Sequence, residues 1–192
     1  VREILMFSCN LRLTAVVSGA EKVTKADREA FADEVIGMLD LQAVEHERVR
    51  DLRSNERKRA SIGVELMANP SIVFLDEPTT GLDASGALTV MQAVHGVCHH
   101  RQVAFICTIH QPSRELFLMF DQLVLMQHGG VLVYFGPVGP NGARLVQYLE
   151  GLPGMQPCQP GANPAHWMLE QTGSVGASPE QKEAKRQLLL DA

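Results

Sequence analysis

Two short apolar runs separated by a helical stretch constrain the fold of this chain more than any other feature. Residues 71–75 (SIVFL) and 102–109 (QVAFICTI) are apolar almost throughout, as strands buried in a parallel sheet tend to be. Four apolar residues between them share one face of the helix expected at residues 84–99, namely Leu88, Met91, Val94 and Cys98. Because strands that alternate with helices form parallel sheets, the sequence predicts an α/β fold with a mostly parallel sheet and flanking helices.

Helical patterns precede this strand–helix–strand unit. Residues 1–13 form the first pattern, Thr24 and Asp27 predict a capping-box start for the second, and residues 55–68 form a third that ends at Asn69-Pro70. Apolar stripes mark the first two helices: Ile4, Phe7 and Leu11, and then Phe31, Val35 and Met38. The sequence therefore predicts a helical region before the sheet.

After the second apolar run, the pattern predicts another helix at residues 110–117 and then a hairpin. Residues 122–126 read as one strand and residues 129–136 as its return strand, with Gly129-Gly130 at the turn. From about Pro153, proline and glycine become frequent, which predicts a linker or extended arm.

Composition excludes several classes of protein. A formal net charge of −5 gives no basic stripe of the kind that binds nucleic acid, and we read Arg57-Lys58-Arg59 as a solvated helix face. The 4 cysteines lack CxxC spacing, which favours reduced thiols over a disulfide framework. No window approaches the roughly 18 apolar residues that a membrane span needs. Both ends interrupt helical patterns, so we expect the chain to be part of a longer protein.

Three polar residues follow the two apolar runs and can carry chemistry. Asp76 and Glu77 come directly after the first run, and His110 comes after the second. Ligands of open parallel sheets bind outside the carboxyl ends of the strands, where these side chains would lie. One carboxylate suits Mg²⁺ beside phosphate oxygens, the other can activate water, and the histidine can donate to a phosphate. The competing interpretation is a plain Asp-Glu turn before a proline.

The motifs as a whole resemble one family. FLDEPTTGLDA is similar to the Walker B and D-loop segments of ABC-type ATPases, and TIHQPS to their H-loop. RSNERKRASIGVELMANPSIVF resembles the signature helix and the run into Walker B. The wording of ERKRASIGVELMANPSI, VYFGPVG and ANPAHWML is closest to subfamily G, of the full-length pleiotropic drug resistance type. This resemblance covers roughly residues 1 to 170.

The resemblance implies a role for each site residue, with ATP and Mg²⁺ as the cofactors. Asp76 would hold Mg²⁺, through water, and Glu77 would be the general base. His110 would be the γ-phosphate switch, and Asp83 would link two nucleotide sites across a dimer. Thr80 stands where the family usually has serine.

The implied fold is that of a P-loop ATPase whose phosphate-loop (Walker A) part lies outside this chain. We expect a helical subdomain with the signature helix at residues 1–68, the C-terminal half of the ATPase core at 69–152, and an arm toward a membrane domain at 153–192. Because no GxxxxGK[ST] loop occurs in the sequence, we expect the chain by itself to bind ATP weakly or not at all and to be inactive.

The signature also departs from the family pattern. Arg53, Ser54, Asn55 and Glu56 stand where the usual pattern is Ser-Gly-Gly followed by Gln or Glu. Ser54, Asn55 and Glu56 remain candidate nucleotide contacts, but side chains now occupy a place where the backbone must approach phosphate. An altered signature beside intact Walker B and H-loop residues resembles the second half of pleiotropic drug resistance proteins, with one working and one degenerate site.

The function implied is ATP hydrolysis that powers export of lipids, sterols or hydrophobic compounds. The implied partners are a second nucleotide-binding domain, packed head to tail, and a transmembrane domain of the same chain. The domain would lie on the cytoplasmic face of a membrane, with the transported substrate bound elsewhere and no nucleic acid involved. Two alternatives stay open: a soluble ABC-type ATPase without a membrane partner, and a truncated, inactive remnant.

Two weaker signals complete the reading. His95 and His99 are four residues apart on the expected helix, so they form either an exposed histidine cluster or two ligands of a metal that lacks an evident third. Trp167, the single tryptophan, predicts an anchor in a small hydrophobic contact, which the resemblance would put near the start of the membrane domain.

Overall fold

The computed structural model describes residues 1–13, 24–127 and 129–172, and these form two compact units. The first unit is Val1–His110 and the second begins at Gln111. This grouping differs from the boundaries expected after residues 68 and 152. The difference has a physical reason: the third helix, expected to belong to a separate subdomain, packs against the helix that joins the two apolar strands. Residues 173–192 of the expected arm lie outside the described part.

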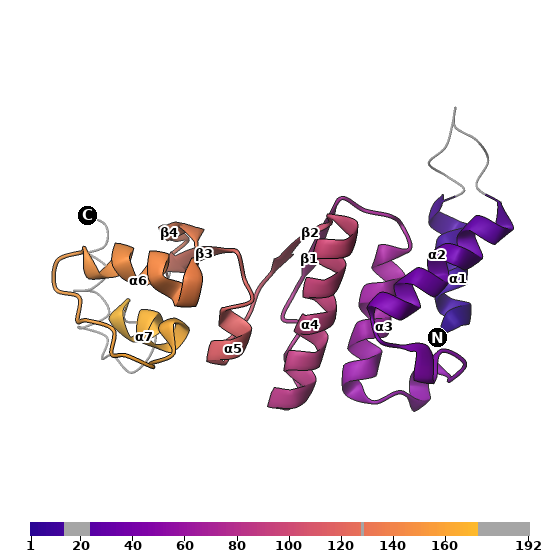
Figure 1. Cartoon of the computed structure of the whole chain (residues 1–192), viewed down its shortest axis with the longest axis horizontal. Helices are drawn as coiled ribbons and strands as arrows, with labels where there is room; N and C mark the ends of the chain where they lie inside the picture. Colours follow the sequence, from indigo (N-terminus) through magenta and orange to yellow (C-terminus); the bar gives the residue numbers. More distant parts are fainter. Residues whose placement is uncertain (14–23, 128, 173–192) are drawn as a thin grey trace. The chain divides into compact units, whose positions relative to one another are not determined.

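Three helices form the first layer of unit 1. They are α1 (Arg2–Leu13), α2 (Lys25–Met38) and α3 (Ser54–Leu66), which contact one another (Figure 1). Short 3₁₀ turns, η1 (Gln42–Val44) and η2 (Val49–Asp51), connect α2 to α3. The capping box at the start of α2 is confirmed, since the Asp27 amide donates to Thr24 Oγ1 and the Thr24 amide to Asp27 Oδ2.

The helix predicted at residues 1–13 is confirmed, but its apolar stripe faces outward. Phe7 and Leu11 are 64% and 60% exposed, whereas Leu5 and Cys9 on the opposite side are fully buried. Leu5 also lies so close to α3 that a Cβ on Gly63 would come within 3.0 Å of a Leu5 methyl carbon. The core of the helical layer is therefore built from the other face of α1.

The prediction of a solvated face for Arg57-Lys58-Arg59 is wrong for Arg59, whose side chain is 5% exposed. Its Nη1 donates to the carbonyl oxygens of Leu39 and Asp40 at the end of α2, at 2.7 and 2.6 Å. Because the last carbonyls of a helix have no partner within the helix, a buried cation is stabilised there. The Arg57 side chain also points back, donating to the Leu52 carbonyl at 3.0 Å.

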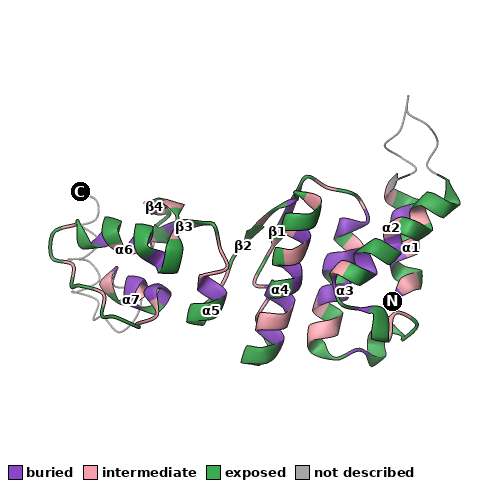
Figure 2. Cartoon of the chain, viewed as in Figure 1, coloured by how far each residue is buried: buried purple, intermediate pink, exposed green. Residues whose placement is uncertain are grey.

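The strand–helix–strand unit is confirmed as parallel. Strand β1 (Ile72–Leu75) and strand β2 (Ala104–Cys107) pair in parallel with Leu75 opposite Cys107, and α4 (Ala84–Arg101) connects them. On α4, Met91 and Val94 are buried, and the helix shows one buried and one exposed side (Figure 2).

The expectation that both strands are buried is wrong. Ile72, Phe74 and Ile106 are 52%, 74% and 54% exposed, and only Val73 of β1 is buried. In the described residues this sheet has two strands, with α4 contacting β2, so side chains on the face away from α4 meet solvent. The hairpin of strands at residues 122–127 and 131–137 forms a second, separate sheet, which is antiparallel.

Unit 2 contains the predicted hairpin. Strand β3 (Gln122–Gln127) pairs antiparallel with strand β4 (Val131–Pro137). Gly129 and Gly130 both have positive φ, 89° and 79°, which a glycine turn accommodates without strain. One face of the hairpin is apolar and exposed, and it consists of two cross-strand pairs: Val124 with Phe135, and Met126 with Leu132.

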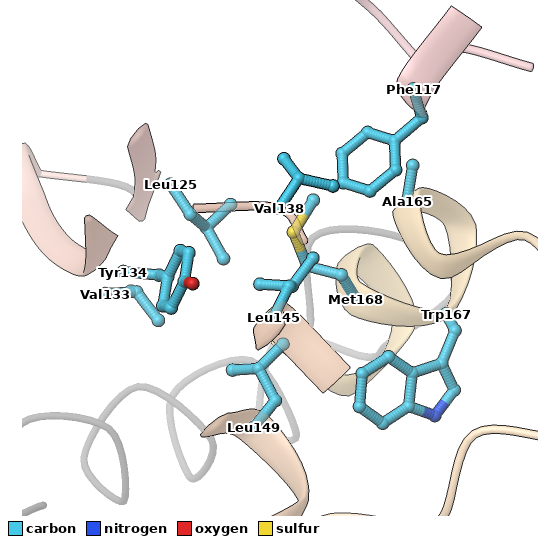
Figure 3. Close-up of a cluster of buried hydrophobic side chains, with 10 residues drawn as sticks. All are labelled: Phe117, Leu125, Val133, Tyr134, Val138, Leu145, Leu149, Ala165, Trp167 and Met168. Carbon is cyan, nitrogen blue, oxygen red and sulfur yellow. The ribbon is translucent and has the colours of Figure 1, made fainter. Parts of the chain in front are cut away.

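Three helices and a 3₁₀ turn accompany this hairpin. They are α5 (Arg114–Phe117), η3 (Pro140–Gly142), α6 (Ala143–Glu150) and α7 (Pro164–Gln171). Their apolar side chains and those of the hairpin form one core (Figure 3), made of Phe117, Leu125, Val133, Tyr134, Val138, Leu145, Leu149, Ala165, Trp167 and Met168. Unit 2 thus has a core of its own.

The expectation of an extended arm from Pro153 is wrong for residues 164–171. Asn163 caps α7 by accepting from the Ala165 amide at 3.1 Å, and its side-chain nitrogen donates to the Pro112 carbonyl at 2.9 Å. Trp167 is 6% exposed, and its Nε1 donates to the Gln156 carbonyl at 3.1 Å. The predicted tryptophan anchor is confirmed, but its contact is the core of unit 2. Among the described helices, none is long and apolar enough to cross a membrane.

Candidate functional site

The two adjacent carboxylates lie where β1 ends. Asp76 directly follows the strand and is exposed, and its Oδ1 accepts a hydrogen bond from Thr108 Oγ1 at 2.7 Å. The Thr108 amide donates to the Leu75 carbonyl at 3.0 Å, which continues the parallel pairing by one residue. The strand register therefore places Asp76 opposite Thr108.

Glu77 occupies the next position, in an uncommon backbone conformation. Its φ is +44°, a region that few residues other than glycine adopt. The Glu77 amide donates to Thr108 Oγ1 at 2.9 Å, and its side-chain Oε2 accepts from Thr80 Oγ1 at 2.8 Å. Lys58 on α3 reaches the Glu77 carbonyl at 3.5 Å. Both the backbone and the carboxylate of Glu77 are thus held by neighbouring polar groups.

Asp83 has a local role that the sequence did not indicate. It is the N-cap of α4, and its Oδ1 accepts from the Gly86 amide at 2.8 Å. A Cβ on Gly86 would lie 2.8 Å from that oxygen and 3.5 Å from the Asn55 Cβ, so glycine permits a close approach of α4 to the start of α3. The capping bond uses one carboxylate oxygen. The predicted role of Asp83 in linking two nucleotide sites stays a prediction.

His110 is exposed and lies two residues beyond Thr108. The hydrogen bonds and ion pairs of the described residues do not join it to Asp76 or Glu77. The structure thus brings Asp76 and Glu77 together through Thr108, and it places His110 after the neighbouring strand without a direct bond to either acid.

The start of α3 satisfies part of its own hydrogen-bonding capacity. The Arg53 amide donates to Glu56 Oε2 at 2.8 Å, and the Glu56 amide donates to Asn55 Oδ1 at 2.7 Å. Ser54 is exposed at the same helix end. Amides at a helix start are the groups that bind phosphate in many proteins. Here side chains of α3 already occupy two of the amides near that end.

The donor set suits Mg²⁺ better than a metal held by protein ligands alone. Mg²⁺ usually takes one or two carboxylates and completes its shell with water and phosphate oxygens, which fits the exposed Asp76 beside Glu77. No group of three or more metal-ligating side chains occurs within residues 1–13, 24–127 and 129–172. His95 and His99 are exposed with ring centroids 4.2 Å apart, and the described residues supply no third ligand.

Sequence reasoning missed Thr108 and Lys58 as parts of this site. Thr108, a hydroxyl residue directly after an apolar strand, could have been recognised as a candidate site residue. Its hydrogen-bond partner, however, depends on strand register, which the sequence does not give. Lys58 was interpreted as part of a solvated basic run. Its contact with the strand end depends on how α3 packs, and this too is not visible in a linear pattern.

Proteins similar in sequence are ABC transporters of the G family. The chain is 45% identical to ABC transporter G family member 35 of Arabidopsis thaliana over 88% of its own length. It is 43% identical to G family member 37 of Oryza sativa subsp. japonica over 91% of its length. In both cases the chain spans 12% of the length of the relative.

A family model matches part of the chain, and solved structures share its fold. Residues 110–188 match the model described as ABC-2 type transporter. The fold is similar to an ATP-binding cassette of an ABC transporter, with a TM-score of 0.53 and 18% identity over 70% of this chain and 54% of that one. It is also similar to cbiO1 from Clostridium perfringens, part of the ABC transporter complex cbiONQ, with a TM-score of 0.57 and 20% identity over 70% of this chain and 50% of that one.

Proposed function

We propose, from its relationship to ABC transporters of the G family, that this chain is the C-terminal part of a nucleotide-binding domain in a subfamily G exporter of the pleiotropic drug resistance type. The observation that carries the proposal is the strand end at which Thr108 ties Asp76 to Glu77. Two acids held together at the carboxyl end of a parallel strand suit a site that handles a metal ion and a reactive water.

Each residue of the site has a proposed role in hydrolysis of ATP. Asp76 would bind Mg²⁺ through water, and the ion would neutralise charge on the phosphates. Glu77 orients the attacking water and accepts its proton, which its half-buried carboxylate, held by Thr80, is placed to do. His110 donates a hydrogen bond as negative charge builds on the transferred phosphoryl group.

The start of α3 supports the proposal that this half carries a degenerate signature. Ser54, Asn55 and Glu56 would face a nucleotide bound to the partner domain. The Asn55 amide oxygen already accepts from the Glu56 backbone amide there, at a place where the usual signature has glycine. One nucleotide site of the assembled protein would then hydrolyse ATP, while the other would bind it without efficient hydrolysis.

We further propose the arrangement of the whole protein. Two nucleotide-binding domains close head to tail on ATP, at the cytoplasmic face of a membrane, and drive a transmembrane domain of the same chain between conformations. The exported compounds are lipids, sterols or other hydrophobic molecules, bound by the membrane domain. The match of residues 110–188 to a transporter family model favours this over a soluble ABC-type ATPase.

The test is Glu77→Gln in the full-length transporter. The substitution keeps the shape of the side chain and removes the base, so steady-state ATP hydrolysis should fall by about a hundredfold or more while nucleotide binding persists. Glu47→Gln is the matched control, since Glu47 is an exposed acid outside the site. Unchanged hydrolysis in Glu77→Gln would mean that Glu77 is not the general base, and the proposed function of this strand end would fail.

A further inference from the structure

We infer that Thr108 is a positioning residue of the hydrolysis site: its single hydroxyl fixes the Asp76 carboxylate and the Glu77 backbone at once. The inference rests on the proposed function and gives a role to Thr108, a residue of the TIHQPS segment to which the sequence reasoning assigned none. It starts from two hydrogen bonds that share one oxygen atom, one at 2.7 Å and the other at 2.9 Å.

The direction of both hydrogen bonds follows from chemistry. The Glu77 amide can only donate, so Thr108 Oγ1 is the acceptor in that bond. An ionised carboxylate can only accept, so the hydroxyl proton of Thr108 points at Asp76 Oδ1. A hydroxyl has one proton and two lone pairs, which means that no alternative orientation satisfies both partners. The orientation of the hydroxyl is therefore fixed, and it restrains the Asp76 carboxylate and the Glu77 amide.

The bond to Asp76 restricts rotation of the carboxylate that would face the metal. With Oδ1 held against β2, rotation about the last side-chain torsion breaks a charge-assisted hydrogen bond, which is stronger than a neutral one. The other oxygen, Oδ2, then keeps a constant direction. An acid that must hold a water-bound ion in one place requires such a restriction.

The bond to Glu77 supports an unusual backbone conformation. At φ = +44° a non-glycine residue is strained, and such strain persists only where neighbouring groups hold it. The amide of Glu77 donates to Thr108, its carbonyl accepts from Lys58, and its carboxylate accepts from Thr80. Removing the Thr108 hydroxyl leaves the amide without its acceptor and releases the residue that carries the proposed base.

The experiment compares Thr108→Val and Thr108→Ser in the full-length transporter. Valine keeps the shape of threonine and removes both hydrogen bonds, whereas serine keeps the hydroxyl. We expect kcat for ATP hydrolysis to fall on the order of ten- to a hundredfold in Thr108→Val, with KM for ATP nearly unchanged, because a small displacement of catalytic groups has effects of this size. Thr108→Ser should restore most of the rate. Thr89→Val, which removes a hydroxyl bonded to the Ser85 carbonyl on α4, is the matched control.

Hydrogen exchange gives a readout that does not depend on activity. The Glu77 amide should exchange several-fold faster in Thr108→Val than in the wild type, and at the wild-type rate in Thr108→Ser. Wild-type kcat and wild-type Glu77 exchange in Thr108→Val would overturn the inference. An equal loss of kcat in Thr108→Val and Thr108→Ser would overturn it too. If Glu77→Gln retains full hydrolysis, the proposed function fails, whereas the exchange result still reports on the Thr108 hydrogen bonds.

Discussion

Nη1 of Arg59 lies 2.7 Å from the carbonyl oxygen of Leu39, so a side chain of α3 caps the end of α2 from inside the core. The same nitrogen also donates to the Asp40 carbonyl at 2.6 Å. Within the described residues, the buried Arg59 Nε has no hydrogen-bond partner. This arrangement ties two helices together through one charged group.

Replacing Arg59 with methionine should lower the free energy of unfolding by about 2–3 kcal/mol. The change keeps much of the apolar stem but leaves the buried Leu39 carbonyl and the part-buried Asp40 carbonyl without their donor, and bonds to charged groups contribute about this much. Urea unfolding followed by circular dichroism measures the effect. Arg50→Met is the control, because the Arg50 side chain is 73% exposed and should change stability by no more than about 0.5 kcal/mol. Equal effects of the two substitutions would contradict the capping role.

Trp167 should report the integrity of unit 2. Trp167→Ala is expected to cost about 3–5 kcal/mol, as for other buried aromatic residues, because it empties part of the core and removes the bond to the Gln156 carbonyl. Thermal unfolding monitored by circular dichroism would show the loss. His166→Ala, one residue away on α7 and 56% exposed, should be nearly neutral. A mild effect of Trp167→Ala would mean that α7 is not part of the core.

The Cys107 thiol should react slowly in the folded protein. Burial raises its pKa to about 11, and the thiolate is the reactive form. The rate at which Cys107 is alkylated, measured by mass spectrometry of its peptide, should therefore keep rising with pH above pH 9 in the folded chain. In urea the rate for the same peptide should be half-maximal near the ordinary thiol pKa of about 8.5 and level off above it. Coincident pH profiles in the two states would contradict the assignment.

Removing the side-chain oxygens that bind the amides at the start of α3 should raise ATP hydrolysis at the nucleotide site of the partner domain, which this signature faces. Asn55→Gly with Glu56→Ala removes the side-chain oxygens that accept from the Arg53 and Glu56 amides. In the full-length transporter, we expect several-fold more ATP hydrolysed in a background that also carries Glu77→Gln, because the gain arises at the other nucleotide site. Glu56→Gln alone is the control, because its amide oxygen can still accept from the Arg53 amide, and it should give no such gain. If the gain disappears when Glu77 is replaced, the extra hydrolysis occurs at the site that uses Glu77, and the prediction is wrong.

Local signals predicted several elements correctly, because the signal and its partner are close in sequence. Thr24 and Asp27 are three residues apart, and the glycine pair at 129–130 fixes the hairpin turn without any distant contact. The Asp76-Glu77 pair was found in the same way, from the apolar run in front of it. Periodicity alone found the helix at residues 1–13 but chose the wrong buried face.

Other features depend on packing that a linear pattern does not contain. Arg59 is buried only because α2 ends against α3, and Thr108 meets Asp76 only because Leu75 pairs with Cys107. The helix at residues 164–171 was missed for another reason. Asn163-Pro164 is a recognisable helix start, with an N-cap asparagine and a proline in the first turn, but the surrounding prolines and glycines outweighed it.

The exposed apolar faces of the two small sheets should affect the solubility of this polypeptide when it is expressed. Phe74 and Ile106 on one sheet, and Val124 and Phe135 on the other, present apolar surface of the kind that promotes association between molecules. Two-stranded sheets also offer unpaired edges, which template contacts between molecules. Soluble yield on expression of this segment should therefore depend on how soon other polypeptide covers these faces after synthesis.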